Sequence, residues 1–356
     1  MAYLFFLPFF IFLGILLNPL QMSELPSVHT SWFWDKKEES GTLKDKRTDV
    51  NPFKLVSGYR LGDRVYSLSS RQAVSADKEE ITEVPFFGRG FFSYKKVGSE
   101  VSFYSMNGEL LWQKPYKSYP FSHPAGSLNF MVSGDGNQVL IVDENGNPAG
   151  SSQADGNFLS DICFAPDGHT LLVFSGGQNY LLDNSGKIIW KAGEEKDAGY
   201  RFYKNGAISE KAERFALHFN EEKNGERKDR VAVYAKTGEP VFELVLDKIY
   251  PFKISMAVSD SGQLLVNTND RVLLFDPKGI PVHRTVKSKE EAVYQTAFET
   301  NGTFIASFQN MLLFLNRKGE VYFQKNSPEP VRIFKNRDPS VIFLESPSHL
   351  ESMTFY

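Results

Sequence analysis

The feature that most constrains the fold is a glycine turn that recurs six times between residues 106 and 319. Each copy follows a short β-rich run, and in four copies a Trp or Phe stands four residues after the glycine. Tight turns of this kind need a positive φ, which a β-carbon makes costly. The six glycines lie 38, 40, 52, 41 and 40 residues apart, at Gly108, Gly146, Gly186, Gly238, Gly279 and Gly319. The chain is therefore a series of equivalent units.

A second, inner turn precedes several of these turns. It occurs at Ala165–Gly168, Ser259–Gly262 and Glu299–Gly302, with its glycine 17 or 18 residues before the next repeat glycine. In the fourth unit Ser209–Ala212 takes this place, and the gap widens to 26 residues. We therefore expect an insertion of about nine residues there (26 minus 17). Asp or Asn near the turns can accept hydrogen bonds from the turn's own amides.

A period near 40 residues with about four short strands per unit is typical of β-propeller blades, which bury their faces by packing in a ring. The Asp-x-x-Gly-Lys-x-x-Trp form at Asp183–Trp190 resembles the quinoprotein-like repeat of bacterial propellers. The inner Ser-x-Asp-Gly-like turn, followed by Leu-Leu-Val, resembles the WD40-like type. The resemblance covers roughly residues 80–356 and is architectural, so it implies packing and almost nothing about a substrate.

Six units are expected at roughly 82–115, 116–155, 156–197, 198–248, 249–289 and 290–327. A seventh begins near Val331, has three strands and then reaches the end of the chain. We expect an all-β, seven-bladed β-propeller over residues 53–356, whose last blade is completed by an N-terminal strand near 64–69. The segment Phe53–Tyr59 is the second candidate for this strand. Six or eight blades stay open as alternatives.

The N-terminal segment, residues 1–22, is predicted to be a hydrophobic anchor helix or an export signal. Residues 3–20 form an uncharged run of 18, at the short end for a membrane span. We find no small-x-small cleavage site, so an uncleaved anchor is preferred to a cleaved signal, with burial in the domain as the third alternative. Trp32 and Trp34 could lie at the bilayer interface or clasp the propeller. Residues 23–52 are interpreted as a charged linker.

Two opposing considerations bear on the side of the membrane. Lys36 and Lys37 lie downstream of the apolar run and favour a cytoplasmic propeller under the positive-inside rule. A single N-terminal apolar segment, however, usually directs export of the domain on its C-terminal side. We expect export, and therefore a membrane-anchored propeller on the extracytoplasmic (periplasmic) side.

The strands of a blade, A to D outward from the axis, place the A–B and C–D hairpins on one face, where the glycine turns lie. The B–C and D–A connections share the other face and are irregular here. Variable loops on one side of a rigid ring are a common place for binding. We therefore predict that this face binds a partner, with Tyr119 and Tyr250 as aromatic anchors. The alternative is that these are ordinary solvated loops.

Composition and motifs argue against several classes of function. Lys and Arg number 40 against 43 Asp and Glu, with no long basic run, which gives nucleic-acid binding little support. The six His residues show no metal-ligand spacing, and Asp143–Asn147 resembles a calcium loop only in part. No nucleophile elbow or phosphate-binding loop occurs. The quinoprotein resemblance would imply a disulfide between adjacent cysteines, but Cys163 is the single cysteine. No catalytic residue, metal or cofactor is predicted.

The favoured function is a non-catalytic, membrane-tethered propeller that acts as a protein-binding scaffold in a cell-envelope assembly. In outline the chain resembles the propeller subunits of bacterial outer-membrane assembly machines, although it lacks their lipid-attachment cysteine. The alternative is a small-ligand or glycan-binding sensor that uses the central channel. A hydrolase or lyase with a site at the channel mouth comes third.

Overall fold

The computed structural model describes residues 28–35, 58–61, 64–67, 72–75, 79–85, 90–124, 127–192, 200–268, 270–286, 295–308, 311–329, 331–335 and 340–355. Every helix or strand within these ranges is a β-strand. The strands, in chain order, are β1 (Val28–Asp35), β2 (Gly58–Leu61), β3 (Arg64–Ser67), β4 (Gln72–Ser75), β5 (Ile81–Glu83), β6 (Gly90–Tyr94), β7 (Val101–Ser105), β8 (Leu110–Lys114), β9 (Ser118–Ser122), β10 (Leu128–Ser133), β11 (Gln138–Asp143), β12 (Pro148–Asp155), β13 (Leu159–Phe164), β14 (Thr170–Phe174), β15 (Tyr180–Leu182), β16 (Ile188–Lys191), β17 (Tyr200–Ile208), β18 (Arg214–Lys223), β19 (Glu226–Ala235), β20 (Pro240–Val245), β21 (Ser255–Val258), β22 (Leu264–Asn267), β23 (Arg271–Phe275), β24 (Pro281–Val286), β25 (Gln295–Thr300), β26 (Thr303–Phe308), β27 (Met311–Leu315), β28 (Val321–Asn326), β29 (Arg332–Lys335), β30 (Val341–Glu345) and β31 (His349–Phe355).

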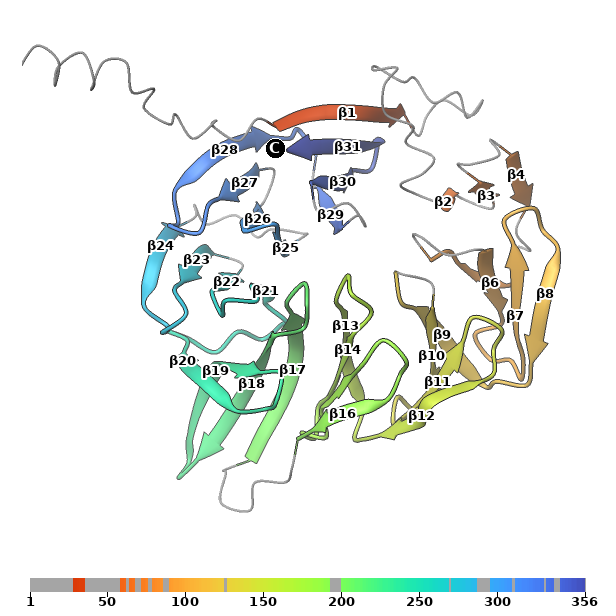
Figure 1. Cartoon of the computed structure of the whole chain (residues 1–356), viewed down its shortest axis with the longest axis horizontal. Coiled ribbons are helices and arrows are strands. Elements are labelled where there is room, and N and C mark those ends of the chain that lie inside the picture. Colours follow the sequence, from red (N-terminus) through yellow and green to blue (C-terminus); the bar gives the residue numbers. More distant parts are fainter. Residues whose placement is uncertain are drawn as a thin grey trace, which may run out of the picture.

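Within the described ranges the strands form eight antiparallel sheets, seven of four strands and one of three. Their orders are β2-β3-β4, β5-β6-β7-β8, β9-β10-β11-β12, β13-β14-β15-β16, β17-β18-β19-β20, β21-β22-β23-β24, β25-β26-β27-β28 and β29-β30-β31-β1. The sheets follow one another around a ring, with the first strand of each four-stranded sheet near the centre and the fourth at the outside (Figure 1). The expected all-β propeller architecture is confirmed.

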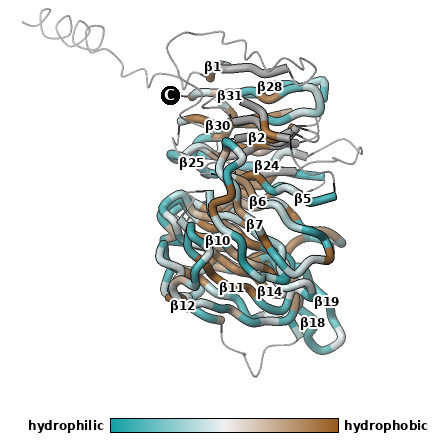
Figure 2. The backbone as a smooth tube through the Cα atoms, turned by 90° about the vertical axis from the view of Figure 1, so that its right-hand side faces the viewer, coloured by the Kyte–Doolittle hydropathy of each residue, from teal (hydrophilic) through white to brown (hydrophobic). Residues whose placement is uncertain are grey.

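The core lies between neighbouring sheets. One cluster joins Leu171 of β14 to Phe215 and Leu217 of β18, and others link successive pairs of sheets in the same way. Figure 2 shows hydrophobic residues along the strands and hydrophilic ones at many of the turns. Since a single small sheet exposes both of its faces, packing in a ring is what removes this apolar surface from water.

The repeat turns have the predicted conformation. All six turn glycines have positive φ, between 74° and 88°. Asp183 Oδ1 accepts hydrogen bonds from the amides of Ser185 (2.9 Å) and Lys187 (2.9 Å). Asp143, Asp276 and Asn316 each accept the same two bonds in their own turns. Asp143 therefore serves its hairpin, as expected for the segment that resembles a calcium loop.

The aromatic residue four positions after the turn glycine packs on the turn of the next sheet. A β-carbon on Gly238 would lie 1.8 Å from Nε1 of Trp190, and one on Gly146 would lie 3.0 Å from Trp112. Where the aromatic is replaced by Gly150, the two backbones touch instead, and the Ser151 amide donates to the Gly186 oxygen (3.0 Å). The aromatic is therefore an inter-sheet spacer, which explains why its identity can vary.

The insertion in the fourth repeat lengthens two strands. Strands β18 and β19 have ten residues each, and they pair along their whole length from Arg214↔Ala235 to Lys223↔Glu226. The extra residues therefore form a longer hairpin within sheet β17-β18-β19-β20. This confirms the interpretation of the 52-residue interval.

The strand that completes the last sheet differs from the one expected. β1 pairs with β31, from Val28↔Phe355 to Asp35↔His349. The expected strand, β3, pairs with β2 and β4 in a separate sheet. Local hairpins of this kind close short loops, which costs less entropy than joining distant segments. Of the two alternatives for Trp32 and Trp34, their strand adopts the clasp. β1 also lies inside the range assigned to the charged linker, so residues 28–35 belong to the folded sheet.

The sheet β2-β3-β4 raises the number of sheets above the seven blades expected. Val65 of β3 is fully buried against Phe91 of the next sheet. Val74 of β4 lies beside Gly108, where a β-carbon would be 3.1 Å away, so it takes the place that Trp112 and Trp190 occupy elsewhere. Among the described residues, the ring therefore contains eight sheets, the larger of the two alternative counts.

The predicted anchor helix falls on residues outside the described ranges. Among the residues that the structure describes, no helix is long and apolar enough to span a membrane.

Candidate binding face

The antiparallel chain path divides the turns between two faces of the ring. We call the side with the repeat turns the glycine face, and the side with the β10–β11, β14–β15 and β18–β19 turns and the connections between sheets the connection face. The long hairpin β18–β19 extends on the connection face. Sequence analysis placed binding on this irregular face.

Tyr119 lies on the innermost strand β9, toward the connection face. Its hydroxyl donates a hydrogen bond to the backbone oxygen of Lys96 (3.2 Å), in the β6–β7 turn of the neighbouring sheet. Its ring meets Tyr94 edge to face, with centroids 6.0 Å apart. Tyr119 is half-buried. It therefore bridges two sheets and keeps some accessible surface, and its binding role stays a prediction.

Tyr250 lies between β20 and β21 and is only 4% exposed. It packs in the cluster that contains Ile254 and Val266. Its hydroxyl donates toward Asp247 Oδ1 (3.2 Å) and Asp270 Oδ1 (3.3 Å). Burial, aided by these two carboxylates, raises the pKa of Tyr250. The Tyr250 side chain is part of the core under the connection face, so position 250 offers a partner little surface to contact.

The two predicted anchors are not brought together. Sheets β13–β16 and β17–β20 separate Tyr119 on β9 from Tyr250 after β20 (Figure 1).

A buried polar cluster fixes the connection that carries Tyr250. Lys204 Nζ donates to both oxygens of Asp229 (3.0 and 3.2 Å) and to the Tyr250 backbone oxygen (2.5 Å). His218 Nε2 lies 3.1 Å from Asp229 Oδ1, and His218 Nδ1 lies 2.9 Å from Asn205 Oδ1. Asn205 in turn donates to the Ile254 oxygen (2.7 Å). These bonds link β17, β18 and β19 to residues 250–254 of the next sheet.

Burial sets the protonation of this cluster. Burial lowers the pKa of both Lys204 and His218, although Asp229 counteracts it. Burial by itself would raise the pKa of Asp229, but hydrogen bonds from His218, the Tyr250 amide and Lys204 outweigh it, and the pKa is lowered. All three side chains are at most 7% exposed. The cluster is enclosed, so we assign it a structural role in holding the connection rigid.

Exposed apolar side chains flank this rigid support. Tyr200 and Phe252 are 74% and 72% exposed, and Phe202 and Ile249 are about half as exposed, at 40% and 44%. Phe202 stands two residues before Lys204, and Phe252 two residues after Tyr250, so both belong to the segments that the Lys204–Tyr250 bond joins. We call Tyr200, Phe202, Ile249 and Phe252 the aromatic patch. Large apolar groups in water at one place are typical of interaction surfaces.

A contact across the inner strands extends this support. Lys253 Nζ donates to the Ser160 backbone oxygen and lies 3.9 Å from Asp161 Oδ1. The other Asp161 oxygen accepts from the Gly206 amide (3.1 Å). Residue 253 therefore reaches past β17 to the start of β13, and three sheets are joined beside Phe252.

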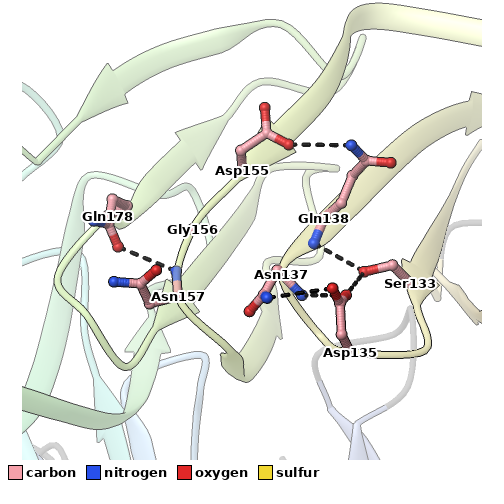
Figure 3. A pocket seen from close by; sticks show the side chains of 8 residues that line it. All are labelled: Ser133, Asp135, Asn137, Gln138, Asp155, Gly156, Asn157 and Gln178. Atoms are coloured by element: carbon pink, nitrogen blue, oxygen red, sulfur yellow. Dashed lines mark hydrogen bonds between the residues drawn. The ribbon is translucent and has the colours of Figure 1, made fainter.

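A polar pocket of about 550 Å³ opens on the same face. The β10–β11 turn, the β12–β13 connection and the β14–β15 turn supply its lining, which comprises Ser133, Asp135, Asn137, Gln138, Asp155, Gly156, Asn157 and Gln178 (Figure 3). Gln138 Nε2 donates to Asp155 Oδ1 (3.3 Å), and Gln178 Oε1 accepts from the Asn157 amide (3.3 Å). The pocket lies between two neighbouring sheets and is open to solvent.

Sequence reasoning did not find the aromatic patch or the pocket. An available signal for the patch was that Tyr200, Phe202 and Phe252 stand in a connection just before or at the start of an inner strand. The pocket residues are scattered over 133–178 and carry no motif. Among the described residues, no group of three His, Cys, Asp or Glu side chains is placed to hold a metal ion.

Comparison with known proteins defines the fold only. No protein-family model matches the chain, and no curated protein sequence matches it. Among solved structures, it is similar to BamB from Moraxella catarrhalis, with a TM-score of 0.54 and 12% identity over 92% of this chain and 100% of that one. It is also similar to the Dos1 propeller, with a TM-score of 0.59 and 10% identity over 92% of this chain and 95% of that one. Both similarities support the propeller fold.

Proposed function

We propose that this protein is a non-catalytic, membrane-tethered scaffold that binds a protein partner through the aromatic patch on its connection face. The observation that carries the proposal is the combination of exposed rings, Tyr200 and Phe252, with the buried Lys204–Asp229 support beneath them. Interfaces are commonly centred on aromatic anchors held in fixed positions, because little conformational entropy is then lost on binding. Similarity to BamB, as a propeller, is consistent with this role.

Charged pairs lie on the elements that carry the patch, but Arg201 and Glu221 point to the opposite face of the sheet from Tyr200 and Phe202, since side chains alternate along β17. Arg201 and Arg230 both pair with Glu221 (3.0 and 2.8 Å), and Lys248 pairs with Asp270 (2.8 Å). Both signs of charge occur side by side in these pairs, so they favour neither an acidic nor a basic partner.

The membrane tether rests on the hydrophobic run of residues 3–20. Only residues 21–27 separate this run from β1, which is already part of the last sheet. Seven residues span at most about 25 Å when extended. The proposed tether is therefore short, and it would hold the edge of the ring that contains β1 close to the bilayer. We propose an envelope location on the extracytoplasmic side.

The test is affinity purification of the full chain from gently solubilised native membranes. The variants are Tyr200→Ala/Phe252→Ala, Tyr119→Ala, and the control Ile280→Ala, which removes a 56% exposed apolar side chain from the glycine face. A stoichiometric partner that is lost only in the double variant supports the proposal. Loss in Tyr119→Ala as well would extend the interface toward β9. A partner retained by the double variant would refute the patch, and no partner with the wild type would refute the scaffold.

A separate experiment tests the tether. The full chain should resist alkaline carbonate extraction from membranes, and a variant lacking residues 3–20 should be released. Protease added from the extracytoplasmic side should reach the propeller. Release of the full chain by carbonate, or protection from the protease, would overturn the anchor or its orientation respectively.

A further inference from the structure

The polar pocket is bordered by an aromatic ring in an unusual conformation. Phe158 is 60% exposed and has a φ of 54°, a left-handed conformation that bulky residues rarely adopt. Its ring lies over Gly136, whose β-carbon would come within 3.1 Å of Phe158 Cδ2. Gly136 lies between Asp135 and Asn137, two residues that line the pocket. The exposed ring therefore stands next to the pocket, over the turn that carries Asp135 and Asn137, although it is not itself a lining residue.

Hydrogen bonds from two turns hold the backbone of Phe158 in place. The Phe158 amide donates to Asn137 Oδ1 (2.9 Å), and its carbonyl accepts from the Ser175 amide (2.9 Å). The next amide, of Leu159, donates to the Gly136 oxygen (2.7 Å). These bonds fix the backbone at residue 158, and the ring stays largely exposed beside Gly136. Strained and exposed residues of this kind occur at binding sites more often than elsewhere.

The pocket presents both donors and acceptors. Within the described part of the chain, Nδ2 of Asn157 and Nε2 of Gln178 donate no hydrogen bond, while Asp135 and Asp155 pair with no Lys, Arg or His. Both carboxylates already accept bonds from neutral donors, Asp135 from Ser133 and Asn137 and Asp155 from Gln138 and Gln153, and Oδ2 of each keeps a lone pair for a further donor. Carboxylate oxygens only accept, and amide NH₂ groups donate. A cationic side chain such as arginine can only donate, so it would leave the two amide groups unmatched. A hydroxyl group both donates and accepts, and it would satisfy both sets.

From this arrangement we infer that the pocket binds a saccharide. The hydroxyl groups of the sugar ring would bond to Asp155, Asn157 and Gln178, and its C–H face would lie against the ring of Phe158. The open form of the pocket suits one or two sugar units at the end or within a longer glycan. This site is separate from the aromatic patch, so it is independent of the proposed protein-binding function.

The test uses saturation-transfer-difference NMR on the purified full chain with three probes: N,N′-diacetylchitobiose, maltotriose and cellotriose. We expect saturation transfer to at least one probe. Phe158→Asn, which removes the ring but tolerates a positive φ, should weaken its binding about tenfold. Gln178→Ala should also weaken it, and Phe158→Tyr, which keeps an aromatic ring, should retain it. Phe252→Ala is the matched control, since it removes another largely exposed ring, from the aromatic patch, and should leave saccharide binding unchanged.

Three results would overturn the inference. The first is no transfer to any of the three saccharides. The second is transfer that persists unchanged in both Phe158→Asn and Gln178→Ala, which would place the sugar elsewhere. The third is binding of a tetra-arginine peptide, abolished by Asp155→Asn, without saccharide binding, which would assign the pocket to a cationic side chain. Circular dichroism of each variant confirms that the fold is retained before binding is compared.

Discussion

Substitution of Gly238 by Ala tests the role of the repeat turn as an inter-sheet contact. The residue has a φ of 88°, and a β-carbon there would lie 1.8 Å from Nε1 of Trp190 on the preceding sheet. Trp190 packs on Phe215 with ring centroids 4.7 Å apart and contacts Tyr234 at 6.2 Å. The added methyl group must therefore displace the indole ring from this aromatic group.

Two costs combine in the Gly238→Ala variant. Placing a β-carbon in the left-handed region costs about 1–2 kcal/mol. Complete truncation of a buried Trp costs about 3–5 kcal/mol, so displacement of the half-buried Trp190 should contribute about 2 kcal/mol. We therefore expect a loss of about 3–4 kcal/mol in the free energy of unfolding. This would be measured from guanidinium titrations followed by far-UV circular dichroism, with the slope compared between variants.

Gly225→Ala is the matched control. Gly225, in the β18–β19 turn, also has a positive φ (77°), but no atom lies within 4 Å of the position its β-carbon would take. It should lose only about 1–2 kcal/mol, the cost of the backbone conformation. In a Trp190→Ala background, Gly238→Ala should also cost only about 1–2 kcal/mol of unfolding free energy, because the clashing ring is gone. Equal losses for Gly238→Ala and Gly225→Ala would show that the reasoning on Trp190 is wrong.

Three further predictions concern the buried polar groups and the closing strand. Burial lowers the pKa of His123 to about 4, so the unfolded chain, with a pKa near 6.5, binds this proton first as the pH falls; the wild type should lose about 3 kcal/mol between pH 6.5 and 4, and His123→Leu should show a smaller loss in the same titration. Lys204→Met should cost about 3–5 kcal/mol because it leaves the Asp229 carboxylate poorly compensated, and adding Asp229→Asn should restore part of it; no recovery in thermal or chemical unfolding would contradict the ion-pair account. Deletion of residues 1–35 should lower the melting temperature and promote association through the open edge of β31, whereas deletion of residues 1–27 should leave the melting temperature unchanged; similar values for both would mean that β1 does not close the ring.

Most of the fold could be predicted from the repeated spacing of the turn glycines. Gly108, Gly186 and their equivalents mark hairpins because the local backbone conformation they need depends on few neighbours. The six units from residue 82 to 327 coincide with six four-stranded sheets, and the unit after Val331 lacks its fourth strand as expected. The insertion near residue 220 was also predictable, since it changes a spacing that the other units keep constant.

The closing strand and the number of sheets were not predictable in the same way. Val28–Asp35 and Arg64–Ser67 are both short runs capable of forming a strand, and the sequence does not specify which one lies beside β31. That choice depends on pairing between segments more than 300 residues apart. The segment 58–75 also lacks the repeat glycine, so only its packing against Phe91 and Gly108 shows that it is a sheet of the ring.

The candidate site shows the same division between local pattern and distant contact. Sequence analysis selected the irregular face because its loops vary, and it selected Tyr119 and Tyr250 because they are aromatic. Burial, which the sequence does not show, separates Tyr250 from its neighbour Phe252. Tyr250 is enclosed by Lys204, Asp229 and Asp247, whereas Phe252, two residues later, is in water. The sequence determined a ring of short antiparallel sheets, because turn conformation and strand periodicity are local properties. Only the tertiary structure decided which strand closes the propeller, which aromatic side chains are exposed and which polar groups meet in the pocket, because these depend on contacts between residues far apart in the chain.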